Sequence, residues 1–202
     1  MTRRLATASG ALALTLALGA CGSTAETVDA PTPSSVSEQG VDDPATFAEA
    51  DTEFAQMMVV HHEGAIEMAG YAAEDATTEE VRALAERIEA AQQPEIELMT
   101  GWLQEWGQDM PDDADMSGMD HGGMDMDGMD QEGAMAELRD LSGADVDRRF
   151  LELMIDHHRG AVEMAETQRS SGENAEAVEL AGRIIDDQQA EITEMERLLA
   201  DL

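Results

Sequence analysis

The chain carries the same motif twice, and this internal repeat limits how it can fold. Residues 54–69 read FAQMMVVHHEGAIEMA, and residues 150–165 read FLELMIDHHRGAVEMA. The register then continues without a gap, 96 positions apart, so that Gln92, Glu95 and Met99 recur as Gln188, Glu191 and Met195. Self-similarity over this length indicates two copies of one supersecondary unit.

Each copy is predicted to form two helices, because apolar residues recur at helical spacing and β-branched runs are scarce. Pro94 lies inside the second predicted helix, where we expect a local irregularity. Two tandem helical hairpins, each with an apolar stripe, bury those stripes best by packing together. The predicted fold class is therefore all-α, a four-helix bundle.

Several residues are placed to begin or end these helices. Thr77 and Glu80 have the spacing of a capping box at the start of the second helix. Asp145 or Asp147 is placed to cap the start of the third helix, and the segment 170–172 (Ser-Ser-Gly) is expected to end it.

The N-terminus has the pattern of a secretory signal. Arg3 and Arg4 precede an apolar run that is too short to cross a bilayer, and a single cysteine follows. The segment 18–21 (Leu-Gly-Ala-Cys) resembles the lipobox of bacterial lipoproteins, which implies cleavage before Cys21 and a lipid anchor on its sulfur. The alternative is an ordinary signal with an incidental cysteine.

These features divide the chain into parts. We predict a lipoprotein signal peptide at 1–20, a flexible tether rich in Ser, Thr, Pro and acids at 21–43, and the bundle at 44–202. Within the bundle, the repeats 44–107 and 144–202 are joined by a loop at 108–135.

Charge and cysteine content exclude several classes of function. The net charge is −34, with 45 acidic residues, so the chain repels nucleic acid. One cysteine allows neither an internal disulfide nor a thiolate cluster. Any soft sulfur ligand in this chain must therefore come from methionine.

Polar residues fall on the predicted apolar faces. On a helical wheel, His61 lies in the middle of its face among Met57, Met58 and Met68, while His62 lies at the edge, closer to water. The second repeat places its histidines in the same way.

The second helix of each repeat also turns polar groups inward, Gln92 and Glu95 beside Met99 in the first copy. Two interpretations remain open at this point. In one, His61 donates a hydrogen bond to Glu95, Gln92 fixes the register, and the methionines fill the core. In the other, neutral imidazole and thioether groups together bind Cu(I).

The segment between the repeats is rich in methionine. Six methionines and one histidine alternate with Asp and Gly from residue 110 to 130, without a helical or strand period. Exposed methionine is a poor packing residue, but a thioether array catches Cu(I), and Asp and His can hold Cu(II). The alternative is a linker of biased composition. The candidate ligands here are Met116, Met119, His121, Met124, Met126 and Met129.

The doubled motif M-x-x-H-H-x-x-A-[IV]-x-M-A, followed by Q-x-x-E-I-x-x-M, resembles the DUF305 family over about residues 47–107 and 144–200. The resemblance implies an extracytoplasmic protein with a ferritin-like four-helix fold and a role in copper binding and tolerance. The metal ligands that it implies in this chain are Met58, His61, His62, Met68, Met99, Met154, His157, His158, Met164 and Met195, with Gln92, Glu95, Gln188 and Glu191 supporting them.

The sequence therefore predicts a copper-binding lipoprotein of the cell envelope that buffers copper or hands it to another envelope protein. Cu(I) is favoured over Cu(II), and no catalytic role is expected. One alternative is a metal-independent scaffold or interaction module. The other is a di-metal oxidase, although the Glu-x-x-His motif of such bundles is missing from the sequence. The oligomeric state is not predicted.

Overall fold

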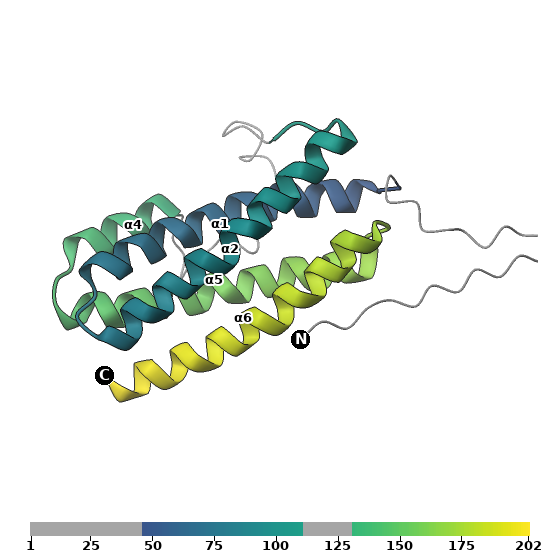
Figure 1. Ribbon diagram of the computed structural model, residues 1–202. Coiled ribbons are helices and arrows are strands. Elements are labelled where there is room, and N and C mark those ends of the chain that lie inside the picture. The colour runs from purple at the N-terminus through teal and green to yellow at the C-terminus, as the bar shows by residue number, and fades with distance from the viewer. Residues whose placement is uncertain (1–45, 111–130) are drawn as a thin grey trace, which may run out of the picture. The chain divides into compact units, whose positions relative to one another are not determined.

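The structure, a computed structural model, describes residues 46–110 and 131–202, and these are helical with short connections (Figure 1). The helices are α1 (Glu49–Asp75), α2 (Glu79–Trp106), α4 (Gln131–Asp140), α5 (Ala144–Ser171) and α6 (Ala175–Asp201). The four long helices match the two predicted hairpins, so the all-α bundle is confirmed. Pro94 lies inside α2, and the helix continues on both sides of it.

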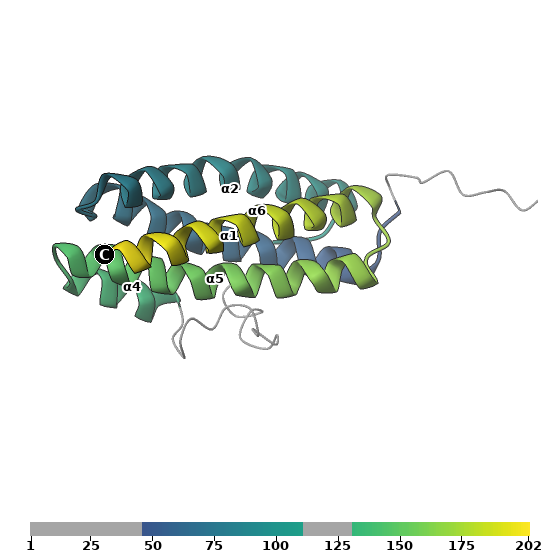
Figure 2. The same cartoon turned by 90° about the horizontal axis from the view of Figure 1, so that it is seen from below.

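The two hairpins pack together mainly through their first helices. Helix α1 pairs with α2, α5 pairs with α6, and α1 packs directly against α5, whereas α2 and α6 touch each other far less (Figures 1 and 2). Helices α1 and α5 are antiparallel, since the start of each contacts the turn that follows the other. No helix among the described residues is both long and apolar enough to cross a membrane.

A buried aspartate near the start of α5 holds the turn of the other hairpin. Asp147 has no exposed surface, and its carboxylate accepts the backbone N–H groups of Thr77 and Thr78 at 2.6 Å and 2.8 Å. Both threonine hydroxyls donate to the same carboxylate. These groups lie just before α2, so Asp147 satisfies donors at the start of a helix that is far away in sequence.

The first repeat makes the equivalent interaction with the second repeat. Asp51, the equivalent of Asp147 on α1, is fully buried and accepts the backbone N–H groups of Glu173 and Asn174 at 3.0 Å and 3.1 Å, just before α6. The amide of Gln168 donates to it at 2.5 Å. Gly172 is needed here, because a Cβ at this position would lie 2.7 Å from the Asp51 carboxylate. Each repeat thus caps the second helix of the other.

This reciprocal capping corrects the predicted helix starts. Thr78 is the N-cap of α2 but makes no side-chain cap, so the predicted capping box of Thr77 and Glu80 is wrong. The N-cap of α5 is Gly143, so neither Asp145 nor Asp147 caps that helix. At the start of α2, the carboxylate of Asp147 takes the donors of Thr77 and Thr78 in place of a local side chain. A charged carboxylate that is fully buried beside these donors is a stronger hydrogen-bond acceptor than a local neutral group. The predicted end of the third helix at Ser171 and Gly172 is confirmed.

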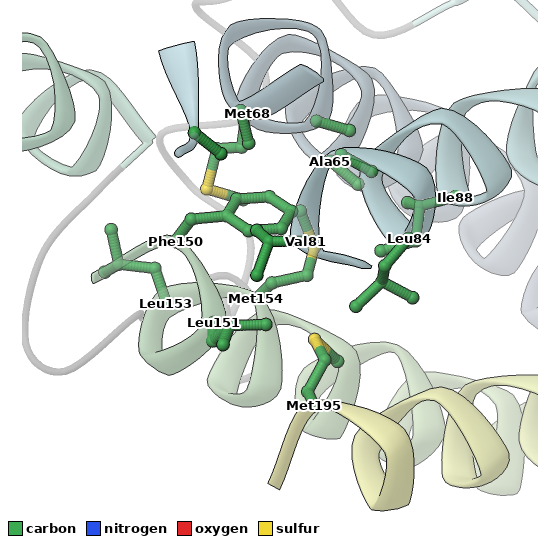
Figure 3. Close-up of a cluster of buried hydrophobic side chains, with 14 of the residues drawn as sticks. Ala65, Met68, Val81, Leu84, Ile88, Phe150, Leu151, Leu153, Met154 and Met195 are labelled. Carbon is green, nitrogen blue, oxygen red and sulfur yellow. The ribbon is translucent and has the colours of Figure 1, made fainter. Parts of the chain in front are cut away.

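The bundle core consists of two clusters related by the repeat. The Phe150 cluster includes Met68, Met154 and Met195 with apolar residues from α1, α2, α5 and α6 (Figure 3). The Phe54 cluster contains the equivalent residues Met58 and Met99, and Met164 packs against it. Because α1 and α5 are antiparallel, each cluster receives one member of each repeated methionine pair.

Helix α4 breaks this symmetry. The predicted loop 108–135 is helical at its end, because residues 131–135 lie in α4. Its buried residues Ala134, Met135 and Leu138 belong to the Phe150 cluster, and the Phe54 cluster contains no α4 residue. Polar contacts reinforce this position, since Gln131 donates to the Gly64 carbonyl at 2.9 Å and Arg149 pairs with Glu137 at 2.9 Å.

Equivalent positions in the two repeats accordingly differ in how much of the side chain is exposed. Met68 in the Phe150 cluster has no exposed surface, whereas its equivalent Met164 is only partly buried. Leu153 is also fully buried, whereas its equivalent Met57 is partly exposed. The half of the core without α4 therefore presents two thioethers near the surface.

The capping role of Asp147 predicts a loss of stability on substitution. Burial alone raises the pKa of Asp147, but the hydrogen bonds from Thr78 and Thr77 outweigh it and hold the pKa below the ordinary 3.8. A pKa lower in the folded state than in the unfolded state gives stability above the unfolded value, and this stability is lost as the pH falls through the folded value. We expect Asp147→Asn to lower the free energy of unfolding by about 2 kcal/mol at pH 7.

The measurement is urea unfolding between pH 7 and pH 2. The wild-type protein should lose more stability on acidification than the variant, because the variant lacks the titrating group. Asp145→Asn is the matched control, since Asp145 is exposed and lies in the same helical turn. Equal stability losses in the two variants would contradict the capping role.

Because α4 covers only the Phe150 cluster, methionines in the two halves of the core are predicted to oxidise at different rates. Methionine oxidation follows exposure, so mild peroxide treatment should convert Met164 and Met57 to sulfoxide well before Met68. Peptide mass spectrometry gives the rate at each site. Leu138→Asp, which places a charge on the buried face of α4, should raise the Met68 rate towards that of Met164. Equal rates for Met68 and Met164 in the unaltered protein would show that α4 does not protect its half of the core.

Candidate metal centre

Four histidines meet where α1 and α5 pack together. His61 and His62 lie on α1, and His157 and His158 lie on α5. The His61 and His157 rings approach each other most closely, with centroids 3.6 Å apart. The ring centroid of His62 lies 6.5 Å from that of His61, and the ring centroid of His158 lies 6.4 Å from that of His157. The fold thus joins two distant sequence pairs into one series of neighbouring imidazoles.

The outer histidines of this series each contact a carboxylate. His62 Nε2 lies 2.7 Å from Glu95 Oε2, and His158 Nε2 lies 2.7 Å from Glu191 Oε2. Each glutamate lies on the second helix of the hairpin that carries its histidine. Both glutamates keep 21% of their side-chain surface exposed. The two pairs are equivalent by the repeat, and their geometry is the same.

Two details of the predicted arrangement are wrong. His62 and His158 were expected at the edge of the apolar face, closer to water, but neither has any exposed surface. In one of the two interpretations His61 donates to Glu95, but the histidine that Glu95 contacts is His62. Both differences have one cause: the helical wheel of α1 alone omits α2, which packs over that edge and brings Glu95 to it.

Burial and the neighbouring rings disfavour the charged form of His157. Burial, followed by the nearby His61, His158 and His62 rings, lowers the pKa of His157 well below its ordinary value. A neutral imidazole has one ring nitrogen with a free lone pair, which is the form that binds metals. The charge state of His157 therefore suits a metal ligand at neutral pH.

Several buried polar atoms in this cluster lack a hydrogen bond. The Nδ1 atoms of His62, His157 and His158 are buried without a hydrogen-bond partner in the structure. The side-chain amide of Gln92, predicted to support the ligands, is also buried with neither its nitrogen nor its oxygen bonded, and the Gln188 oxygen is in the same state. Such atoms are rare in folded proteins and need an explanation, such as a bound ion or water.

The candidate methionines of the bundle lie on both sides of the histidines. Five of them are fully buried, and Met164 is partly buried. On α1, Met58 belongs to the Phe54 cluster and Met68 to the Phe150 cluster, with His61 between them in sequence. On α1, candidate methionines thus precede and follow His61 along the helix, and each belongs to a different core cluster.

Oxygen and nitrogen donors alone do not form a metal site here. Within 46–110 and 131–202, no three His, Cys, Asp or Glu side chains are grouped closely enough to hold a metal ion. These two parts of the chain therefore do not assemble the carboxylate and histidine ligands of a di-metal site. A site built on these histidines needs a further kind of donor, and thioether sulfur is the kind that the surrounding core supplies.

Some predicted residues lie outside the described part of the chain. These are the lipidation candidate Cys21 and the loop ligands Met116, Met119, His121, Met124, Met126 and Met129. Single helices did not reveal Asp51, and they gave Asp147 only a local capping role, whereas both aspartates fix how α1 and α5 pack. Their equivalent positions in the two repeats were the available signal, because an acidic residue recurs there on an otherwise apolar face.

Solved structures resemble this chain over most of its length. A DUF305 fragment from Deinococcus radiodurans is 32% identical with a TM-score of 0.67, and the match covers 77% of this chain and 98% of that one. A DUF305 protein from Streptomyces coelicolor, described as secreted, is 34% identical with a TM-score of 0.67, covering 75% and 91%. CopM in a Cu(II)-bound form is 35% identical with a TM-score of 0.62, covering 75% and 96%, and CopM is also known in a Cu(I)-bound form.

No curated protein matches the sequence. The family described as a domain of unknown function, DUF305, matches residues 51–199, which include both histidine pairs and the four long helices. The resemblance of the doubled motif is thereby confirmed, and the chain belongs to the DUF305 family.

Proposed function

We propose that this protein binds copper outside the cytoplasm through histidine and methionine, and buffers it or delivers it to another envelope protein. The observation that carries the proposal is the series of four buried imidazoles, three of them with an unbonded Nδ1, between two core clusters that contain methionine. The similarity to CopM, which is known with Cu(I) and Cu(II) bound, supports the choice of metal.

Cu(I) is the oxidation state that this donor set favours. Thioether and neutral imidazole are soft and intermediate donors, which select Cu(I), whereas Mg²⁺ and Ca²⁺ prefer oxygen. Thioethers also keep their metal affinity in an oxidising compartment, where free cysteines form disulfides. Cu(II) fits the Asp and His residues of the segment between the repeats better than the bundle core.

The location follows from the N-terminus and from the relatives. The signal-like segment and the similarity to a DUF305 protein described as secreted support an extracytoplasmic site of action. We propose that Cys21 carries a lipid that anchors the protein to the bacterial membrane. The residues between Cys21 and the bundle then act as a tether.

The methionine-rich segment supplies a second group of ligands. We propose that Met116, Met119, His121, Met124, Met126 and Met129 capture copper, while the bundle holds it among buried ligands. The protein then acts as a carrier or buffer and not as an enzyme.

A metal-independent scaffold is the second candidate. The His62–Glu95 and His158–Glu191 hydrogen bonds satisfy one nitrogen of each outer ring without a metal, as a structural network would. The unbonded Nδ1 atoms favour the metal-binding function instead, because a network that served only structure would leave fewer buried groups unsatisfied. Anaerobic titration with Cu(I) against a chromophoric chelator distinguishes the two functions.

The segment between the repeats should account for part of the bound copper. We expect replacement of Met116, Met119, Met124, Met126 and Met129 by leucine to remove some Cu(I) equivalents from soluble residues 22–202, since leucine keeps the apolar bulk and loses the sulfur. The measurement is the chelator competition. Changing the aspartates of this segment to asparagine is the control, and it should leave Cu(I) stoichiometry unchanged. Unchanged stoichiometry in the leucine variant would remove this segment from the proposed function.

The bundle should account for the rest. In the chain that already has leucine at the five segment positions, we expect Met154→Leu to weaken Cu(I) binding about tenfold, which corresponds to the loss of about 1.4 kcal/mol of binding free energy with one ligand. Met135→Leu is the matched control, since Met135 is equally buried in the Phe150 cluster but lies on α4. The two swaps conserve volume and should cost less than about 1.5 kcal/mol of stability. Equal affinities of the two variants would show that Met154 only fills the core.

A further inference from the structure

We infer that Glu95 and Glu191 are positioning residues that fix the His62 and His158 rings with Nδ1, and not Nε2, as the metal-binding atom. The inference rests on the proposed copper function and adds to it the ligand atom and the residues that select it. It is drawn from the 2.7 Å contacts of the two Nε2 atoms and from the unbonded state of the two Nδ1 atoms.

The first step is the position of the proton on each ring. An ionised carboxylate can only accept hydrogen bonds, so the nitrogen that faces it must donate. His62 Nε2 therefore carries the proton that it shares with Glu95 Oε2. In the neutral form of the ring, which has one N–H, His62 Nδ1 is then the nitrogen with the lone pair. The same argument applies to His158 and Glu191.

The second step is where that lone pair faces. The two ring nitrogens point in different directions, so a ring whose Nε2 faces the glutamate turns Nδ1 away from it. His62 and His158 have no exposed surface, and their Nδ1 atoms have no hydrogen-bond partner in the structure. Each lone pair is thus directed into protein, and no described protein group donates a hydrogen bond to it. A metal ion can accept such a lone pair, because a neutral imidazole nitrogen is a metal ligand.

The third step is the repetition of the geometry. The distances and the exposure of the glutamates are the same in both repeats, although residue 63 and residue 159 beside the histidines are Glu in one copy and Arg in the other. A carboxylate that accepts the second N–H of a metal-bound histidine orients the ring and increases its basicity. Loss of such a partner weakens metal binding by about 10- to 100-fold in known sites.

The structure also makes the test selective. Glu95 and Glu191 each keep 21% exposed side-chain surface, so replacing them does not open a hole in the core. Glu95 acts on His62 and Glu191 acts on His158, so each single variant contains its own reference in the other repeat. Glu97 is exposed on the same helix as Glu95, and Glu97→Gln is therefore the control for the loss of charge.

The first measurement uses the metal-free protein. Long-range ¹H–¹⁵N spectra of soluble residues 22–202 should show a protonated Nε2 and an unprotonated Nδ1 for His62 and His158. Glu95→Leu should release His62 into a mixture of tautomers and leave His158 unchanged, and Glu191→Leu should do the reverse. Glu95→Gln, which retains an accepting oxygen, should preserve the His62 tautomer. A protonated Nδ1 in the unaltered protein would overturn the inference, whatever the protein binds.

The second measurement adds Ag(I), a soft ion that does not change oxidation state under these conditions. Binding should shift the Nδ1 signals of His62 and His158 and leave their Nε2 protons in place. In the chain with leucine at the five segment methionines, Glu95→Leu should weaken Cu(I) binding about 10- to 100-fold, and Glu97→Gln should not change it.

The outcomes separate this inference from the proposed function. Ag(I) binding at Nε2, with loss of its proton, would overturn the inference and leave copper binding intact. Ag(I) that shifts none of the four histidines would overturn it as well, and would also remove the bundle from the proposed function. A Glu95→Leu variant with unchanged Cu(I) affinity would show that the glutamates do not position the ligands.

Discussion

Two buried aspartates, Asp51 and Asp147, determine how the halves of this protein fit together. Each accepts backbone hydrogen bonds from the turn of the other repeat, so both ends of the α1–α5 pair are fixed at the same time. A slip of α1 along α5 would break these bonds and leave buried charges without partners, which is costly. The same two anchors bring His61 to His157 in the middle of the pair. The histidine series therefore depends on residues that lie near the far ends of the helices.

The sequence alone was enough for the properties that repeat at short range. Apolar spacing predicted the four long helices, and the duplication predicted their hairpin order. The failures came where a residue's partner is distant in sequence. Thr77 and Thr78 resemble a local cap, but a carboxylate about 70 positions away takes their donors. His62 looked half-exposed because a wheel of one helix omits the neighbouring helix. The pairing of the two histidine doublets was likewise out of reach, since the direction of α5 relative to α1 is set by long-range contacts.

Helix α4 shows how a duplicated fold becomes asymmetric. Ala134, Met135 and Leu138 have helical spacing, but they follow directly on the methionine-rich segment, whose composition concealed the pattern. Once folded, these residues help to bury the Phe150 cluster, while Met164, which packs against the Phe54 cluster, stays partly exposed. Two sites that began as copies thus differ in their access to solvent. Under the proposed copper function, metal would exchange faster in the half without α4.

The unsatisfied polar atoms of the core are best understood as a cost of function. A bundle selected only for stability would replace His157 and Gln92 by apolar residues, because buried polar groups without partners each cost about 1–3 kcal/mol. Here the cost is contained, since the outer rings bond to Glu95 and Glu191 and the aspartate caps hold the helices in register independently of the histidines. Under the proposed copper function, the aspartate caps would hold α1 and α5, and with them the four histidines, in place before a metal binds. A binding site that needs little reorganisation loses less free energy on binding.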